Sequence, residues 1–151
     1  MVRFKKGLHC AYSITASAGS GISAGWGISA GWGISAGSGI SAGSGISAGS
    51  CISAGGGISA GEGISAGSGI SAGRGISAKL ELSASYNIFV GVSRWKKAEG
   101  DDKKITCGKL VKGTIAYGDL VETGIATTEK SLAGTEVTVT VGDKIYKTVI
   151  Q

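Results

Sequence analysis

Proline is missing from this chain of 151 residues, although glycine supplies 29 of them. Glycine at this level without proline argues against a collagen triple helix. Histidine occurs once, and the three cysteines, Cys10, Cys51 and Cys107, lack the spacing of metal ligands. We therefore expect no metal, no cofactor and a reduced, cytosolic protein, with a single disulfide as the alternative.

Long apolar runs are also missing. No stretch approaches the roughly 20 apolar residues that a membrane-spanning helix needs. Residues 1–18 have the basic start and the Ala-Ser-Ala ending of a signal peptide, but His9 and Ser13 interrupt the apolar stretch between them. The sequence predicts a protein that is neither secreted nor bound to a membrane and that works in the cytoplasm of a host cell.

A strict six-residue repeat, Ile-Ser-Ala-Gly-x-Gly, fills the middle of the chain. Weaker copies starting at Ala16, Leu82 and Ile88 extend the same frame, which gives thirteen units over residues 16–93. Short strict periods are typical of a solenoid or a fibre, not of a globule with a closed core. Isoleucine begins the ten strong copies, at Ile22, Ile28, Ile34, Ile40, Ile46, Ile52, Ile58, Ile64, Ile70 and Ile76.

Each unit predicts a three-residue strand followed by a turn. Side chains of an extended chain alternate between two faces, so isoleucine and alanine share one face and serine takes the other. The x position holds serine, tryptophan, glycine, glutamate and arginine in different copies, which is unlike a packed interior position. The two glycines beside x predict a corner that needs positive φ or a close approach of backbones.

Three units would form a triangular coil of 18 residues. We therefore predict an all-β, single-chain, three-sided β-solenoid of about four coils. Residues 1–15 are expected to form an N-terminal cap strand, residues 16–93 the solenoid, and residues 94–151 a C-terminal β cap or appendage. Within the appendage, alternating valines and threonines before Gly142-Asp143 indicate a β-hairpin.

The repeat resembles the hexapeptide-repeat left-handed β-helix, whose unit is aliphatic, small, two free residues, small, free. That family places a small interior residue two positions before each aliphatic, where this chain has Trp26, Trp32, Glu62 and Arg74. A right-handed, bactofilin-like β-helix is therefore the alternative. The chain is also similar to small proteins of phages and mobile elements that carry GIxAGxGIxAG arrays, followed by segments like ITCGKL from Ile105 and AYGDL from Ala116.

Two groups of residues are candidate binding sites. Trp26 and Trp32 both occupy x, and exposed tryptophans are common anchors of protein interfaces. The plainer interpretation is that they cover the first corners or pack on the N-terminal segment. Arg94, Trp95, Lys96 and Lys97 form a basic cluster in which lysines would meet phosphates and Trp95 would stack on a base. The plainer interpretation of that cluster is a solvated loop.

Net charge is +5, and it lies at the ends of the chain, because the repeat itself is neutral. Nucleic-acid binding would therefore use the basic ends, including Arg3, Lys5 and Lys6. Some hexapeptide-repeat acyltransferases use a histidine as base, but His9 lies outside the repeat and beside no acidic motif. Cys51 replaces a corner glycine, and nothing near it in the sequence would activate a thiolate. We expect no catalytic residues.

The sequence favours a non-enzymatic protein that binds a host protein or ribonucleoprotein. Given the resemblance to phage proteins, the specific expectation is an inhibitor of host defence, such as an anti-CRISPR. The main alternative is a structural protein, a trimeric phage fibre or stalk in which repeats from several chains associate. Nucleic-acid binding through the basic ends is a second alternative, and a homo-oligomer fits more than one of these hypotheses.

Overall fold

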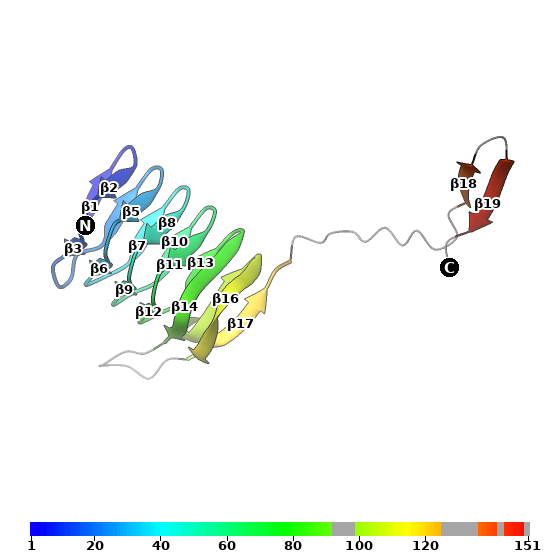
Figure 1. Ribbon diagram of the computed structural model, residues 1–151. Coiled ribbons are helices and arrows are strands. Elements are labelled where there is room, and N and C mark those ends of the chain that lie inside the picture. Colours follow the sequence, from blue (N-terminus) through cyan, green and yellow to red (C-terminus); the bar gives the residue numbers. More distant parts are fainter. Residues whose placement is uncertain (92–98, 125–135, 142–143, 150–151) are drawn as a thin grey trace.

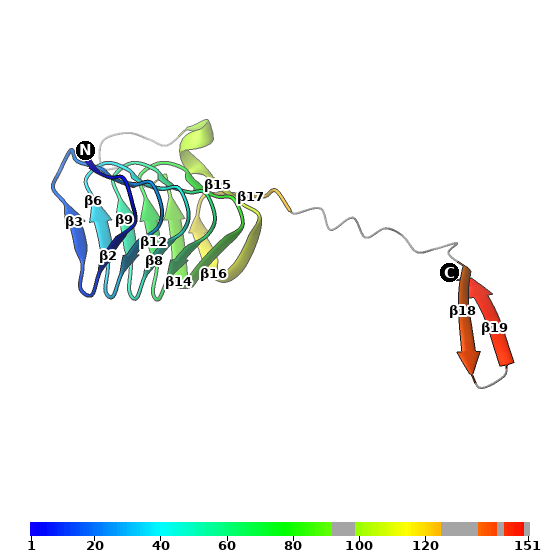
Figure 2. The same cartoon turned by 90° about the horizontal axis from the view of Figure 1, so that it is seen from above.

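A computed structural model describes residues 1–91, 99–124, 136–141 and 144–149. Within these ranges the chain is all-β apart from one short 3-10 helix, η1 (Gly100–Lys103). Short strands wind into coils that stack along one axis, and each coil has three sides (Figure 1; Figure 2). The predicted all-β solenoid is confirmed.

Each of the ten strong copies of the repeat forms one three-residue strand, with the predicted bounds. The strands up to the end of the strong repeat are β1 (Val2–Phe4), β2 (Leu8–Cys10), β3 (Ile14–Ala16), β4 (Ile22–Ala24), β5 (Ile28–Ala30), β6 (Ile34–Ala36), β7 (Ile40–Ala42), β8 (Ile46–Ala48), β9 (Ile52–Ala54), β10 (Ile58–Ala60), β11 (Ile64–Ala66), β12 (Ile70–Ala72) and β13 (Ile76–Ala78). Longer strands follow, namely β14 (Glu81–Val90), β15 (Lys104–Cys107), β16 (Lys109–Tyr117) and β17 (Asp119–Glu122).

All strands of the solenoid pair in parallel, and they form three faces. Face A has the order β1-β4-β7-β10-β13-β15-β17. Face B contains β2, β5, β8, β11 and the first part of β14, whereas face C contains β3, β6, β9, β12 and the last part of β14. The long strand β14 turns the corner between faces B and C, and β16 pairs along it. Within the repeat each residue lies beside the one 18 positions later, as in Ile22 with Ile40.

The solenoid has about six coils, so the expectation of about four was too low. Residues 1–15 were expected to be a cap strand, but β1, β2 and β3 lie on the three faces and pair with β4, β5 and β6, which makes a complete first coil. At the other end, β15 and β17 continue face A and β16 continues faces B and C. The winding therefore continues well beyond residues 16–93.

The prediction that Ala16 begins a repeat unit was also wrong. Ala16 pairs with Ala36, so it takes the alanine position of a unit that begins at Ile14. Val2, Leu8 and Ile14 are six apart, and the corner that follows, residues 17–21, is two residues longer than the others. In that corner the Ser20 N–H donates to the Ser17 carbonyl at 2.9 Å, and Gly19 has φ of 81°.

Isoleucine and alanine fill the axis of the solenoid, as predicted. From Ile22 to Ile105 the aliphatic residues of the three columns are at most 2% exposed, and the alanines of the repeat are at most 6% exposed. Burying an isoleucine stabilises a fold by roughly 1.5–3 kcal/mol, so most of the stability resides in these columns. At the corners, residues such as Arg74 and Trp26 lie outside, as the x position predicted.

Close backbone approach, not positive φ, explains the corner glycines of the repeat. Among the described residues the only positive-φ glycine before Gly91 is Gly19. Corners hydrogen-bond from coil to coil through the main chain, as in Gly43 N–H to the Ala24 carbonyl at 3.1 Å and Ser44 N–H to the Trp26 carbonyl at 3.3 Å. A Cβ at Gly43 would overlap the carbonyl oxygen of Gly25.

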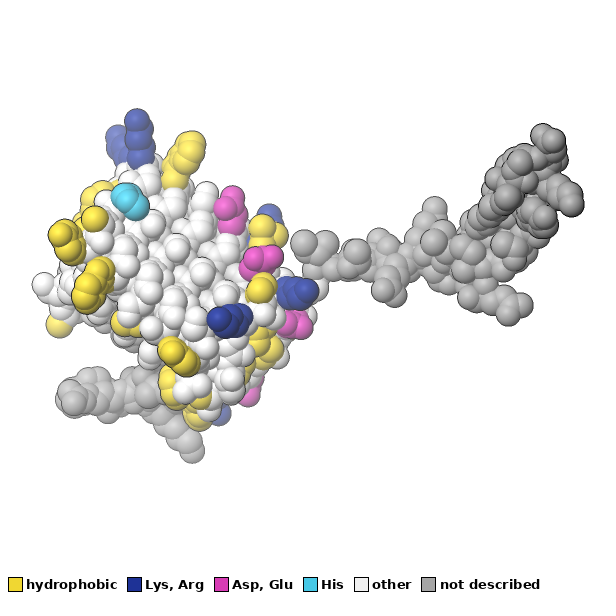
Figure 3. Space-filling model, in the orientation of Figure 1, with side chains coloured by type: hydrophobic (Ala, Val, Ile, Leu, Met, Phe, Trp, Pro, Cys, Tyr) yellow, Lys and Arg dark blue, Asp and Glu magenta, His cyan; other side chains and the backbone are white. Residues whose placement is uncertain are grey.

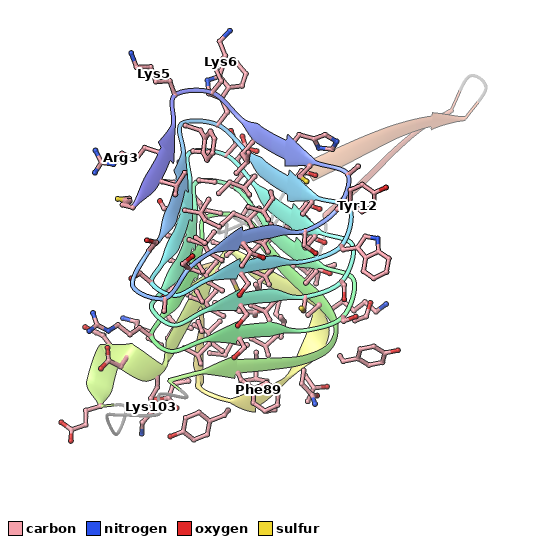
Figure 4. All side chains as sticks on the ribbon, turned by 90° about the vertical axis from the view of Figure 1, so that its left-hand side faces the viewer. Arg3, Lys5, Lys6, Tyr12, Phe89 and Lys103 are labelled. Carbon is pink, nitrogen blue, oxygen red and sulfur yellow. The ribbon has the colours of Figure 1, made fainter. Side chains whose placement is uncertain are left out.

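The coil is right-handed. Seen from the N-terminal end, the chain runs from Arg3 on one side over Lys5 and Lys6 to Tyr12 on the other, which is clockwise (Figure 4). Later coils lie behind the first in this view, so the chain turns clockwise as it recedes. The winding therefore has the opposite sense to that of a left-handed β-helix, and x residues two positions before an isoleucine, such as Trp26 and Arg74, lie outside the coil.

The predicted C-terminal hairpin is confirmed. β18 (Glu136–Val141) and β19 (Lys144–Val149) are antiparallel, with Val141 opposite Lys144. The turn residues Gly142 and Asp143 lie outside the described residues. Within the described ranges, the structure contains no helix with the length and apolar character needed to cross a membrane.

Candidate partner-binding surface

Two exposed tryptophans stand at the two ends of β5. Trp26 occupies the corner between β4 and β5, and Trp32 occupies the corner between β5 and β6. Their exposed fractions are 68% and 66%. They therefore lie on neighbouring corners of one coil, at the two edges of face B, as the three-sided coil predicted. They do not pack against the first coil as covered side chains.

The tryptophans are not needed to form these corners. In the next coil the same two corners carry Ser44 and Ser50, and the hydrogen bonds that join the coils come from the backbone. Ser44 N–H donates to the Trp26 carbonyl at 3.3 Å, and Ser50 N–H donates to the Trp32 carbonyl at 2.7 Å. Since serine makes the same corner, the indole side chains contribute little to the fold.

A third aromatic residue, Tyr12, belongs to this surface. Its carbonyl accepts the Trp32 N–H at 3.2 Å, so Tyr12 and Trp32 occupy the same corner of successive coils. Tyr12 is 75% exposed. Sequence reasoning missed it because the first coil was taken as a cap. A signal was present: Tyr12 precedes Ile14 by two residues, just as Trp26 precedes Ile28.

Between the corners, face B has a flat, uncharged floor. A shallow hollow of about 650 Å³ runs along β2, β5, β8 and β11 beside Trp26, and its polar side chains are His9, Ser29, Ser47 and Ser65. In Figure 3 this floor is the white area, with hydrophobic side chains and the histidine at its N-terminal edge. A flat neutral floor with aromatic edges is suited to contact with a macromolecule.

The hollow lacks the groups for acid-base catalysis. His9 lies beside Ser29 in the strand register, but the residues lining the hollow include no carboxylate that would orient its ring. Across the described ranges, no group of three His, Cys, Asp or Glu residues is placed to hold a metal ion. The expectation that the protein is not an enzyme stays a prediction.

The predicted basic cluster Arg94, Trp95, Lys96 and Lys97 lies outside the described residues. Two basic residues near the C-terminal end of the described solenoid have acidic neighbours: Lys104 Nζ lies 3.8 Å from Asp101 Oδ1, and Arg74 Nε lies 3.9 Å from Asp102 Oδ1. At the other end, Arg3, Lys5 and Lys6 extend from the first coil into solvent (Figure 4).

A second hollow, of about 670 Å³, lies on the corner between faces A and B near the end of the solenoid. Its charged lining residues are Glu62, Glu81, Glu122 and Lys109. The charges are mixed, and Glu122 is already engaged, since its Oε1 accepts the Leu110 N–H at 2.7 Å. We do not regard this hollow as a binding site.

The three cysteines are free thiols in very different surroundings. Cys51 is exposed, Cys10 is half-buried and Cys107 is buried. Burial, and secondarily the charge of Glu122, raises the pKa of the Cys107 thiol, so less thiolate is present at any given pH.

We expect iodoacetamide at neutral pH to alkylate Cys51 first and to spare Cys107 until the protein is unfolded by urea. Mass spectrometry of peptides after timed quenching measures this order. Labelling of Cys107 at the rate of Cys51 in the native protein would contradict the buried position of the thiol in the last coils.

No protein-family model, curated protein or solved structure matches this chain.

Proposed function

We propose that this chain is a non-enzymatic binding protein, in which a rigid right-handed solenoid presents Tyr12, Trp26 and Trp32 to a partner protein. The observation that carries the proposal is the replacement of serine by tryptophan at two corners where serine folds equally well. Large exposed aromatic side chains that the fold does not require are the usual anchors of protein interfaces.

A protein partner is favoured over a nucleic acid by the chemistry of face B. The outward residues between the two tryptophan corners are serines and His9, which give no row of cations to follow a phosphate backbone. The three cations of the first coil lie at one end only. Flat neutral surfaces with aromatic edges resemble protein interfaces more than nucleic-acid clefts.

Inhibition of a host defence component stays a prediction, supported by the resemblance to phage proteins. For the alternative of a trimeric fibre, one structural observation is relevant. A single chain completes all three sides of every coil, so the coils do not require association of several chains.

The double variant Trp26→Ser/Trp32→Ser tests the proposed surface. It reproduces the corner residues of the next coil, so folding should be unchanged. Anchor residues contribute about 2 kcal/mol or more each, so we expect partner binding to weaken by at least ~30-fold per tryptophan. Affinity capture from host lysate identifies the partner, and calorimetry with the purified partner measures the loss.

Tyr86→Ser is the matched control. Tyr86 is 69% exposed on the same corner as Trp32, but several coils away. We expect this variant to bind like the wild type. Equal loss in both variants, or capture that disappears with nuclease treatment, would refute a protein interface at the tryptophans.

A further inference from the structure

Four large exposed side chains surround face B, two on each of its edges. The edge between faces A and B, which we call the AB corner, has Trp26 and Leu80. The edge between faces B and C, the BC corner, has Trp32 and Tyr86. Leu80 and Tyr86 are 41% and 69% exposed, so they protrude as the tryptophans do. In Figure 3 hydrophobic side chains lie at both ends of the white floor.

The four side chains are placed symmetrically along the solenoid. Face B has six strands, in the order β2, β5, β8, β11, the first part of β14 and the first part of β16. The two tryptophans flank the second strand, and Leu80 and Tyr86 flank the fifth. Corners of the third and fourth coils have smaller or polar residues, namely Ser44, Ser50, Glu62 and Ser68. A half turn about an axis between the third and fourth strands therefore exchanges large side chains with large ones.

The floor between the two corners is complementary to itself. From the second to the fifth strand its outward residues are all serines, namely Ser29, Ser47, Ser65 and Ser83. A hydroxyl group both donates and accepts hydrogen bonds, so two such floors can satisfy each other, whereas a charged floor would repel its copy. A two-fold interface requires a surface of this kind, because the same patch is used by both molecules.

We propose that face B is the contact surface of a homodimer, in which two solenoids lie face to face with their axes antiparallel. The two-fold axis runs parallel to the strands and passes between β8 and β11. Trp26 then packs against Leu80 of the second copy. Trp32 packs against Tyr86 of the second copy, and each of these contacts occurs twice. The inference goes beyond the proposed function and does not depend on it.

Charge favours antiparallel over parallel axes. The AB corner begins with two cations in the first coil, Lys5 and Lys6. Its other end borders the second hollow, whose charged residues are Lys109 and the acidic Glu62, Glu81 and Glu122. Antiparallel packing brings the two lysines of each molecule to the acidic end of the same corner in the other. Parallel axes would place Lys112 of face B opposite its own copy, whereas antiparallel axes place it opposite His9.

The size of face B fits a dimer that dissociates on dilution. Strands about 4.8 Å apart give six strands a span of about 24 Å, and a hexad covers at most about 20 Å across the face. Each molecule therefore covers roughly 480 Å² of the other, or about 1,000 Å² in total. That area lies at the lower limit for a specific interface, which indicates a weak dimer.

Sedimentation of the full chain at several concentrations tests the dimer. We expect the wild type to pass from monomer to dimer as its concentration rises, with no larger species. In Leu80→Ser/Tyr86→Ser every large corner contact loses one of its two side chains. Serine already forms both corners two coils earlier, at Ser44 and Ser50, so folding should be unchanged. We expect the dissociation constant of the dimer to rise at least tenfold.

Phe89→Ser is the matched control. Phe89 is 38% exposed but lies on face C, where it pairs in register with Ser71 of the preceding coil (Figure 4). The variant therefore removes an exposed aromatic side chain of the same strand without touching face B. We expect it to dimerise like the wild type.

Charge exchange tests the direction of the pairing. Lys5→Glu/Lys6→Glu and Glu81→Lys each place like charges opposite each other in their own dimers, so each should dimerise several-fold more weakly than the wild type. In an equimolar mixture of the two, residues 5 and 6 of each molecule again face the opposite charge at residue 81 of the other. Mixing should therefore restore dimers. With parallel axes these positions do not meet, and mixing would restore nothing.

Three results would overturn the inference: a wild type that stays monomeric at every concentration, wild-type dimerisation of Leu80→Ser/Tyr86→Ser, or a mixture of charge variants as weak as its components. The proposed function is tested separately, because Leu80→Ser/Tyr86→Ser keeps Tyr12, Trp26 and Trp32. Capture of a partner protein by this variant should persist whether or not the dimer forms. A partner and a second copy would compete for the same face.

Discussion

Gly43→Ala is expected to destabilise the solenoid strongly, whereas Gly45→Ala, two residues away in the same corner, is expected to be neutral or slightly stabilising. A Cβ at Gly43 would overlap the Gly25 carbonyl oxygen of the preceding coil, and only a shift of the backbone would relieve the overlap. Forced overpacking of this kind typically costs about 1–3 kcal/mol, occasionally more. A Cβ at Gly45 would lie 3.4 Å from the Gly63 carbonyl oxygen, at ordinary contact distance.

The two variants remove equal backbone freedom from the unfolded chain, by about 0.4–1 kcal/mol, so their difference isolates the close approach in the folded state. Cys51 supports the asymmetry, because it occupies the second glycine position of its corner. Urea unfolding followed by circular dichroism measures both free energies of unfolding. Equal stability of the two variants would show that coil spacing does not depend on the first glycine.

Ile46→Ala should also destabilise the solenoid strongly, with a loss of about 2–5 kcal/mol. Ile46 is 1% exposed and lies between Ile28 and Ile64 in the column under face B. Parallel pairing on both sides fixes the backbone of β8, so the coil cannot collapse into the cavity. Because each coil contacts only its neighbours, loss of one central contact weakens both halves of the stack.

Ser47→Ala is the control for this prediction. Ser47 follows Ile46 but points outward and is exposed, so its loss should change stability by less than about 0.5 kcal/mol. Calorimetric unfolding of both variants measures the difference. If Ile46→Ala unfolded at the temperature of Ser47→Ala, the aliphatic columns would not be the main source of stability.

Much of the fold could be predicted because the period of the sequence equals the period of the structure. The six-residue spacing of isoleucine fixed the strands, and side-chain alternation placed Ile and Ala inside and Trp26 and Arg74 outside. Three units per coil also placed the two tryptophans on neighbouring corners. Each of these inferences used only local geometry.

What the sequence did not predict depends on interactions between coils. The corner of residues 17–21 contains two extra residues, so the frame drawn from Ile22 back to Ala16 missed the coil that begins at Val2. That error hid Tyr12 and made the expected solenoid too short. The handedness of the solenoid likewise depends on how successive coils are connected in space, which the sequence of one repeat does not show. The choice between positive φ and close approach at the glycines needed the positions of carbonyls 18 residues away.

The three-sided coil has a consequence for changes in the length of the repeat. Gain or loss of one hexad would keep every isoleucine pointing at the axis, yet it would turn all later residues by a third of a revolution. Tyr86, now on the corner of Trp32, would move to a different edge of the prism. Only insertions or deletions of 18 residues keep two corners in the same orientation about the solenoid axis. The relative positions of side chains on the surface therefore constrain the number of repeats even where stability does not.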